Sequence, residues 1–274
     1  MLWLLLGYRS PAIAGLWGIG LALVFSFFQG KFRPTRQQLY DAVQEGFYLV
    51  AILSLLLIAV GPLGQVMLTT NLSGRLGSAL IEYLPDTQLI LLLGAMVVSL
   101  ILGMGLPTPV AYIIVALALV PFMQQIGIPA LQAHFFVFYF AVFSTLTPPV
   151  AVSVLAAAKL GEATFLSTAK DSMKIALTTF IIPFAFVFSP ELMLFPDMTY
   201  GTLLAIAEVI FVQLAVSVAS YGFLFRSLNG AERFGYALVA SAGFLGFTYE
   251  TNFWYVAVAL FLAISGYIFV SKKS

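Results

Sequence analysis

The sequence predicts an all-α polytopic membrane protein, and composition is the first reason. Hydrophobic residues make up 62% of the 274 positions, charged residues make up 8%, and the mean hydropathy is +1.06. Soluble domains contain about 45–50% apolar and about 25% charged residues, so this composition excludes a soluble fold. The second reason is the stretch between Asp86 and Lys159, which carries no charged residue. It contains runs long enough to enter or cross the hydrocarbon core of a bilayer.

Eight apolar segments follow one another along the chain. A helix of about 20 residues crosses about 30 Å of hydrocarbon at 1.5 Å per residue. The segments cover residues 11–28, 46–68, 89–122, 133–158, 175–194, 203–225, 236–247 and 253–270. Residues 69–86 are more polar and are predicted to lie at the membrane interface. Residues 236–247 are too short to cross without their flanks.

Basic residues predict the orientation, because cytoplasmic loops are enriched in Lys and Arg. If the loop after the first segment is cytoplasmic, ten of the twelve basic residues fall on the cytoplasmic side. These ten are Lys31, Arg33, Arg36, Lys159, Lys170, Lys174, Arg226, Arg233, Lys272 and Lys273, whereas Arg9 and Arg75 fall outside. The N-terminus is therefore predicted to be outside and the C-terminus cytoplasmic.

The segment 89–122 is interrupted by Gly-Met-Gly-Leu-Pro-Thr-Pro at residues 103–109, which we call the first break. The distribution of basic residues allows this segment either to cross the membrane twice or to enter it and return to the same side. Each arm has only about 16 residues and the tip carries no charge, so a re-entrant hairpin is favoured. Gly103 and Gly105 permit backbone angles closed to other residues, and Pro107 ends helix on its N-terminal side. The helix that follows directs its N-terminal amides, together with the Thr108 hydroxyl, toward the tip, where an anion would be stabilised.

The segment 133–158 is interrupted by Ser-Thr-Leu-Thr-Pro-Pro at residues 144–149, which we call the second break. Thr145 and Thr147 supply hydroxyl oxygens, and Pro148 is expected to free carbonyls of the preceding turn. Hydroxyl and carbonyl oxygens without a carboxylate suit a hard cation such as Na⁺. A single kink of this kind is more often structural than functional. Two clustered breaks in adjacent uncharged segments favour the midplane site of a secondary transporter.

The residues around both breaks closely resemble those of TRAP transporter large membrane subunits (DctM-like). The resemblance rests on LILGMGLPTPVAYIIVALALVPFM, on HFFVFYFAVFSTLTPPVAVSVLAAA, and on the FIIPF run that ends at Phe184, and it covers about residues 47–194. The GMGLPT tip and the appended helical tail look like the fused permeases that work with TAXI-type solute-binding proteins.

This resemblance implies sodium-driven uptake by an elevator mechanism in a bacterial or archaeal cytoplasmic (inner) membrane. It implies a small organic acid as substrate, Na⁺ as coupling ion with no other cofactor, and an extracytoplasmic solute-binding protein of the TAXI type as partner. The family's sodium and substrate sites lie around the hairpin and the broken helix. They map here to Gly103, Gly105, Pro107, Thr108, Ser144, Thr145, Thr147 and Pro148, and Tyr112 and Tyr139 flank the breaks as candidate cavity-lining residues.

The family has two inverted repeats, but the sequence shows one unit of hairpin and broken helix. We therefore expect the second repeat, the C-terminal half of a permease. The first repeat and the small-subunit helices would belong to a longer chain or to a separate polypeptide. The expected parts are a membrane helix and basic cytoplasmic loop (1–46), a core repeat (47–195) and an extension of about three helical segments (196–274). Within the core repeat, an arm helix precedes the hairpin 89–122, the broken helix 133–158 and a closing helix 171–195.

Other classes of function have less support in the residues. The chain has no cysteine, one histidine and a net charge of +1, which argues against thiolate metal sites, a histidine metal site and nucleic-acid binding. An intramembrane enzyme is disfavoured because H-E-x-x-H is absent and His134 lies ten residues before Ser144. A channel would require charge rings or a repeated filter. A non-transporting structural or assembly subunit remains the alternative, and proton coupling through Glu208 stays open beside sodium.

Overall fold

The computed structural model describes residues 10–28, 30, 33–85, 87–193, 199–249 and 253–271. Four basic residues used for the orientation, Arg9, Lys31, Lys272 and Lys273, lie outside these ranges, as does Asp86. The described part consists of helices and their connections, with one isolated β-bridge between Phe223 and Ser227. The chain divides into two compact units, Met1–Ile58 and Ala59–Ser274, which are considered separately.

The first unit holds α2 (Pro11–Phe27) and most of α3 (Arg36–Thr69). The Ser10 hydroxyl accepts a hydrogen bond from the Ile13 amide at 3.3 Å and caps α2. Thr35 and Gln38 bond reciprocally, with the Thr35 amide donating to Gln38 Oε1 (2.9 Å) and the Gln38 amide donating to Thr35 Oγ1 (3.2 Å). This capping box starts α3 ten residues before the apolar segment predicted at residue 46. The basic loop is therefore shorter than expected, because Arg36 is already helical.

The second unit is built around an aromatic core shared by α4 (Leu72–Tyr83), α5 (Gln88–Gly103), α6 (Thr108–Gln125), α7 (Ala130–Phe143) and α10 (Ile181–Phe188). On α7, the ring centroids of Phe136 and Phe140 lie 4.9 Å apart, and the ring centroid of Phe184 on α10 lies 5.3 Å from that of Phe136. Gly77 lets α4 approach α6, since a Cβ there would lie 2.9 Å from Phe122 Cδ2. These edge-to-face aromatic contacts hold α10 against α7, the helix that leads to the second break.

After the second break the chain continues as α8 (Val152–Leu160), α9 (Phe165–Thr179) and α10. The closing helix, expected at 171–195, instead begins at Phe165, where the Thr164 hydroxyl accepts from the Ser167 amide at 3.4 Å. The helical stretch Phe165–Phe188 ends before the short 3₁₀ turn η2 (Pro190–Met193). Hydropathy missed the start because the first turns of α9 are polar.

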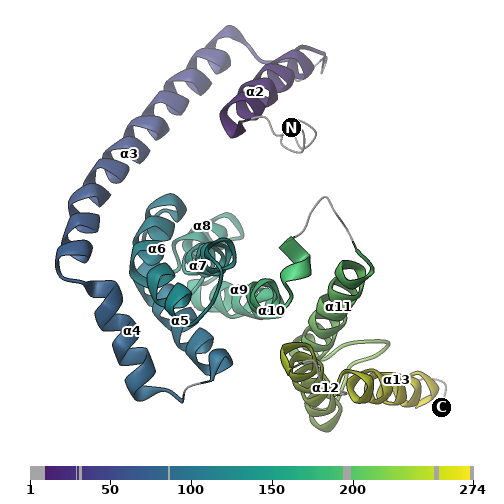
Figure 1. Cartoon of the computed structure of the whole chain (residues 1–274). Coiled ribbons are helices and arrows are strands. Elements are labelled where there is room, and N and C mark those ends of the chain that lie inside the picture. The colour runs from purple at the N-terminus through teal and green to yellow at the C-terminus, as the bar shows by residue number, and fades with distance from the viewer. Residues whose placement is uncertain are drawn as a thin grey trace. The chain divides into compact units, whose positions relative to one another are not determined.

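In the C-terminal region, the described residues 199–249 and 253–271 form three helices, α11 (Tyr200–Tyr221), α12 (Gly230–Tyr249) and α13 (Phe253–Ser271) (Figure 1). Helix α12 extends beyond the predicted 236–247 at both ends. Tyr236 of α12 is fully buried, and its hydroxyl lies 2.7 Å from the Ser265 hydroxyl of α13. Helices α11 and α12 also pack closely on one another.

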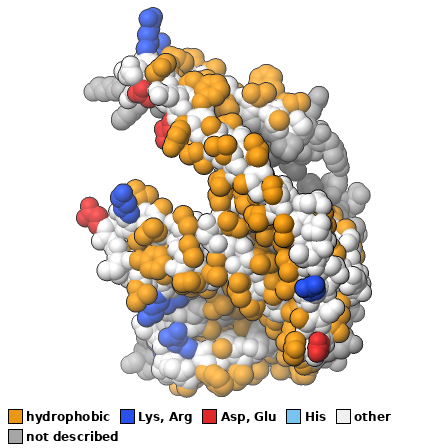
Figure 2. All heavy atoms as spheres, turned by 90° about the vertical axis from the view of Figure 1, so that its left-hand side faces the viewer, with side chains coloured by type: hydrophobic (Ala, Val, Ile, Leu, Met, Phe, Trp, Pro, Cys, Tyr) orange, Lys and Arg blue, Asp and Glu red, His pale blue; other side chains and the backbone are white. Residues whose placement is uncertain are grey.

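Apolar side chains dominate the exposed surface. Within the described ranges, five helical stretches are long and apolar enough to cross a membrane: Arg36–Thr69, Thr108–Gln125, Phe165–Phe188, Tyr200–Tyr221 and Phe253–Val270. Figure 2 shows hydrophobic side chains spread over the face it draws, with few charged groups among them. This surface is suited to hydrocarbon rather than water. It agrees with the predicted all-α membrane fold class.

Candidate functional site

The two breaks lie against each other in the second unit. Gly103, the last residue of α5, is buried, and a Cβ at this position would lie 2.9 Å from the Cβ of Ser144. Gly105 marks a second close approach, because a Cβ added there would lie 3.3 Å from Val150 Cγ1. The structure therefore brings together residues about forty positions apart, and the small size of both glycines permits the approach.

The first break is a tight connection between two helices. The Met104 amide donates to the Ile101 carbonyl and the Leu106 amide to the Gly103 carbonyl, both at 3.3 Å. Gly105 has φ +77°, a left-handed conformation that glycine adopts without strain. This pattern leaves the Leu102 carbonyl with no hydrogen-bond donor among the described residues.

Helix α6 begins at Thr108 with Pro107 as its N-cap residue. No acidic residue lies in its first turn, and no side chain caps it. The amides of Thr108 and Val110 and the Thr108 hydroxyl have no hydrogen-bond partner within the described ranges. These groups can donate to an anion at the positive end of the helix dipole.

The hydroxyls of the second break bond back to the end of α7. The Ser144 hydroxyl is buried and donates to the Ala141 carbonyl at 2.6 Å. Thr145 and Thr147 donate to the carbonyls of Val142 (2.8 Å) and Phe143 (2.9 Å), respectively. The sequence predicted that Pro148 and Pro149 would free carbonyls of the preceding turn, and the carbonyls that lose an i+4 amide donor to them are those of Ser144 and Thr145. Both carbonyls instead accept from other amides, that of Ser144 from Thr147 (3.3 Å) and that of Thr145 from Ser153 (3.2 Å).

The three hydroxyl bonds follow a common local pattern, in which a Ser or Thr hydroxyl donates to a carbonyl three or four residues earlier on its own helix. Donating its single proton in this way leaves each hydroxyl oxygen with acceptor lone pairs. Ser144, Thr145 and Thr147 thus keep their capacity to bind a cation. Pro148 is exposed and joins Pro149 through a cis peptide bond.

Ser153, on the restarted helix α8, was not singled out from the sequence. Its amide donates to the Thr145 carbonyl and its hydroxyl to Thr145 Oγ1, both at 3.2 Å. Ala151, with φ +40°, turns the chain so that this contact forms. The available signal was a hydroxyl residue shortly after the Pro-Pro pair. Its contact fixes the two halves of the broken helix to each other.

The two tyrosines flanking the breaks have different environments. Tyr112 Oη lies 2.9 Å from His134 Nδ1, and the Tyr112 ring packs edge-on against Phe138. Tyr139 packs on Phe143, with ring centroids 5.3 Å apart. Glu208, the other residue weighed for a role, is half-buried on α11. It lies in the C-terminal helices rather than in either break.

Within the described ranges, no three His, Cys, Asp or Glu side chains come together as a metal-binding group. The oxygen atoms gathered at the breaks are instead hydroxyls and carbonyls. Such a set fits a monovalent hard cation better than a transition metal, which prefers imidazole or thiolate ligands.

Comparison with known protein families gives a match over the part of the chain that contains both breaks. Residues 1–199 match the family model described as "Tripartite ATP-independent periplasmic transporter, DctM component". The match contains both breaks and ends before α11. No curated protein and no solved structure gives a match. The resemblance inferred from the sequence is thus confirmed at the level of the family, and with it the polytopic membrane fold class.

Proposed function

The chain belongs to the DctM component family of tripartite ATP-independent periplasmic transporters, and from this premise we propose that it takes up a small organic acid together with Na⁺. Membership makes the chain a membrane permease subunit whose partners are a periplasmic binding protein and a small membrane subunit. The proposal adds the coupling ion, the substrate class and the part of the chain that binds them.

The sodium site is proposed at the contact between Gly103 and Ser144. Their close approach is the observation that carries the proposal, because it places the end of α5 beside the hydroxyl-rich end of α7. The hydroxyl oxygens of Thr145 and Thr147 and the Leu102 carbonyl at the end of α5 supply neutral oxygen ligands. Helix C-terminal ends and unwound carbonyls are the usual sodium ligands of secondary transporters.

The substrate carboxylate is proposed to bind at the start of α6. Thr108 offers both an amide and a hydroxyl there, and the Val110 amide points from the same turn. A carboxylate accepts such hydrogen bonds and is stabilised by the helix dipole. Tyr112 and Tyr139 are proposed to line the cavity beside it. The cation and the anion would then bind on neighbouring helix ends, which couples their affinities electrostatically.

The mechanism proposed is an elevator movement of a unit containing a re-entrant hairpin. The first arm, α5, has 16 residues and is short for a full crossing, whereas α6 has 18. We propose a TAXI-type binding protein as the external partner, and the other permease half and small-subunit helices as membrane partners. The orientation proposed has the N-terminus outside and the C-terminus cytoplasmic in the inner membrane, because the basic residues divide that way.

The test is a thermal-stability titration of the purified chain with NaCl against KCl at constant ionic strength. A ligand that binds only the folded state stabilises it by RT ln(1 + [L]/Kd), about 2.7 kcal/mol at a hundredfold excess over Kd. We expect Na⁺ alone to raise the melting temperature. The double variant Thr108→Ala/Thr147→Ala should lose this response.

Thr168→Ala is the matched control, because its hydroxyl also donates to a carbonyl of its own helix region, that of Thr164 at 3.0 Å, but far from the breaks in sequence. It should keep the sodium response. Equal effects of Na⁺ and K⁺, or an equal loss in the control, would contradict a sodium site at the breaks. They would favour a non-transporting structural subunit or coupling to another ion.

A further inference from the structure

A groove of roughly 430 Å³ lies between the core of the second unit and the C-terminal helices. One wall comes from α5, α9 and α10, including Met96, Phe180 and Phe184, and the other comes from α11 and α12, including Val216 and Phe244. This volume lies within the range of about 300–1,000 Å³ typical of ligand-binding clefts. The lining is almost wholly apolar, so the groove suits a hydrocarbon chain.

The groove is distinct from the transport site. Neither the breaks nor the two flanking tyrosines contribute to its lining. Its second wall is made of residues beyond 199, where the family match ends. Ser220 and Ser241 are the hydroxyl residues in its lining, and the Ser241 hydroxyl already donates to the Ala237 carbonyl at 2.9 Å.

Arg233 lies at one end of the groove. Its Nε donates to the Ala219 carbonyl and its Nη2 to the Ser220 carbonyl, both at 3.0 Å, and Ala219 and Ser220 are lining residues. On α12, the lining residues Ala237, Ala240, Ser241 and Phe244 follow Arg233 at spacings of 4, 7, 8 and 11. These spacings place Arg233 on the same helix face as the groove.

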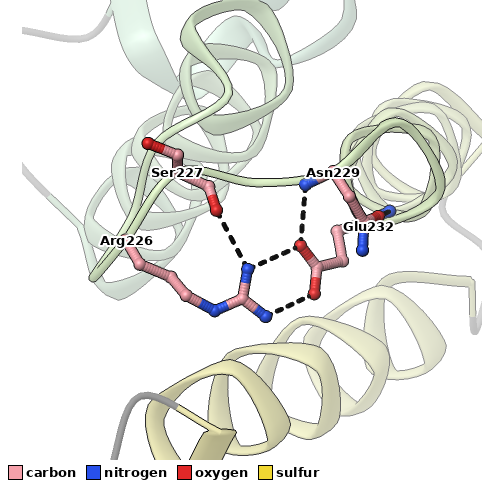
Figure 3. Close-up of polar contacts among 4 residues, drawn as sticks. All are labelled: Arg226, Ser227, Asn229 and Glu232. Carbon is pink, nitrogen blue, oxygen red and sulfur yellow. Dashed lines mark hydrogen bonds and ion pairs between the residues drawn. The ribbon is translucent and has the colours of Figure 1, made fainter.

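The charge of Arg233 is not balanced by a carboxylate within the described ranges, and its side chain is exposed. Arg226, in the connection between α11 and α12, is instead paired with a carboxylate. Its guanidinium binds both carboxylate oxygens of Glu232, which also accepts the Asn229 amide (Figure 3). Arg233 therefore offers its Nη1 to an external anion, whereas the carboxylate of Glu232 is already occupied.

We propose that the groove binds an acyl chain of an anionic phospholipid, with the lipid phosphate on the Arg233 guanidinium. An apolar groove continued by a single unneutralised cation matches the two ends of such a lipid. The predicted orientation places Arg233 on the cytoplasmic side, where anionic lipids gather and where basic pockets between membrane helices bind their headgroups. The lipid would fill the space between the family core and the C-terminal helices and hold the two together.

The test is native mass spectrometry of the chain released from micelles containing phosphatidylglycerol or phosphatidylcholine with identical acyl chains. We expect one phosphatidylglycerol to be retained per chain, at least fivefold more often than phosphatidylcholine. Arg233→Gln should bring the ratio close to one, and Arg233→Lys should restore a preference. Lys170→Gln, which removes an exposed cation elsewhere on the predicted cytoplasmic side, should leave the ratio unchanged.

Ala237→Phe tests the groove itself, because Ala237 lies in the lining one turn after Arg233. Filling the groove should reduce retention of both lipids several-fold. Leu238→Phe, an exposed neighbour outside the lining, should not. Equal retention by the two phenylalanine variants, or a phosphatidylglycerol preference that survives Arg233→Gln, would overturn the proposal. So would a lipid-free dimer that Ala237→Phe converts to monomer, since a second copy would then occupy the groove.

Discussion

Gly103 closes α5 directly against Ser144, the residue that follows α7, so each break depends on the other for its packing. A Cβ at Gly103 would lie 2.9 Å from the Ser144 Cβ and closer still to the hydroxyl oxygen. Both residues are buried, so neither can move into open space. The contact makes glycine at 103 a requirement of the tertiary structure as well as of the turn.

Gly103→Ala should therefore destabilise the chain by about 1–3 kcal/mol, the usual effect of overpacking a tight interior contact. Ser144→Gly removes the opposing Cβ, so the double variant should lose less stability than the sum of the two single variants. Chemical denaturation in detergent micelles measures all three. Gly266→Ala on α13 is the control, since a Cβ there meets nothing within 4 Å. Additive losses in the double variant would argue against the Gly103–Ser144 contact.

Gly105→Ala tests the backbone of the first break. Its φ of +77° is left-handed, and an added Cβ would also contact Val150 at 3.3 Å. We expect a loss of about 1–2 kcal/mol from the left-handed backbone, increased by the contact. Gly127→Ala, with φ +87° and nothing within 4 Å, isolates the backbone cost. Thermal unfolding should show Gly105→Ala to be less stable than Gly127→Ala. The reverse order would show that the Val150 side chain moves away from the added Cβ at no cost in stability.

The sequence predicted both breaks because their causes are local. Glycine and proline act on the residues beside them, so the end of α5 at Gly103 and the start of α6 at Thr108 fall inside the predicted first break. The contact of Gly103 with Ser144 depends on how α5 packs against α7. No spacing in the chain encodes that packing, so it could not be predicted.

Helix boundaries were misplaced where polar residues continue an apolar helix. Hydropathy located the membrane segments but missed the first turns of α3 and α9, which are set by the capping residues Thr35 and Thr164. Arg233 was interpreted only as an orientation charge. Its bonds to the carbonyls that end α11 require the two helices to meet, which a charge pattern does not reveal. The contact of His134 with Tyr112 could not be predicted for the same reason, because it requires α6 and α7 to meet.

The link between α11 and α12 should carry a measurable pH dependence. Hydrogen bonds from the Arg226 guanidinium, followed by the Asn229 amide, hold the pKa of Glu232 below its ordinary value. A carboxyl whose pKa is lowered on folding stabilises the folded state above its unfolded pKa, about 4.3, and loses this contribution as the pH falls through its folded pKa. The advantage of the native chain over Glu232→Gln should therefore be full near neutral pH and shrink below about pH 4.3.

Thermal unfolding of both chains from pH 7 down to about pH 3 measures this difference. Asp171→Asn serves as the control, because Asp171 forms an exposed pair with Lys174 at 3.5 Å, and such pairs contribute little to stability. A constant difference between the native chain and Glu232→Gln across the whole range would contradict the ionic role of Glu232. It would leave Glu232 as a helix cap alone.

Tyr112→Phe should destabilise the chain by about 0.5–1.5 kcal/mol, because it removes one hydrogen bond between two half-buried side chains. The Tyr112 hydroxyl lies 2.9 Å from His134 Nδ1, and this bond joins α6, just beyond the first break, to α7, which leads to the second. Tyr139→Phe is the matched control, since the Tyr139 hydroxyl has no hydrogen-bond partner within the described ranges, and it should leave stability nearly unchanged. In a His134→Ala background, Tyr112→Phe should cost much less. A full loss in that background would show that the Tyr112 hydroxyl stabilises the chain through a group other than His134.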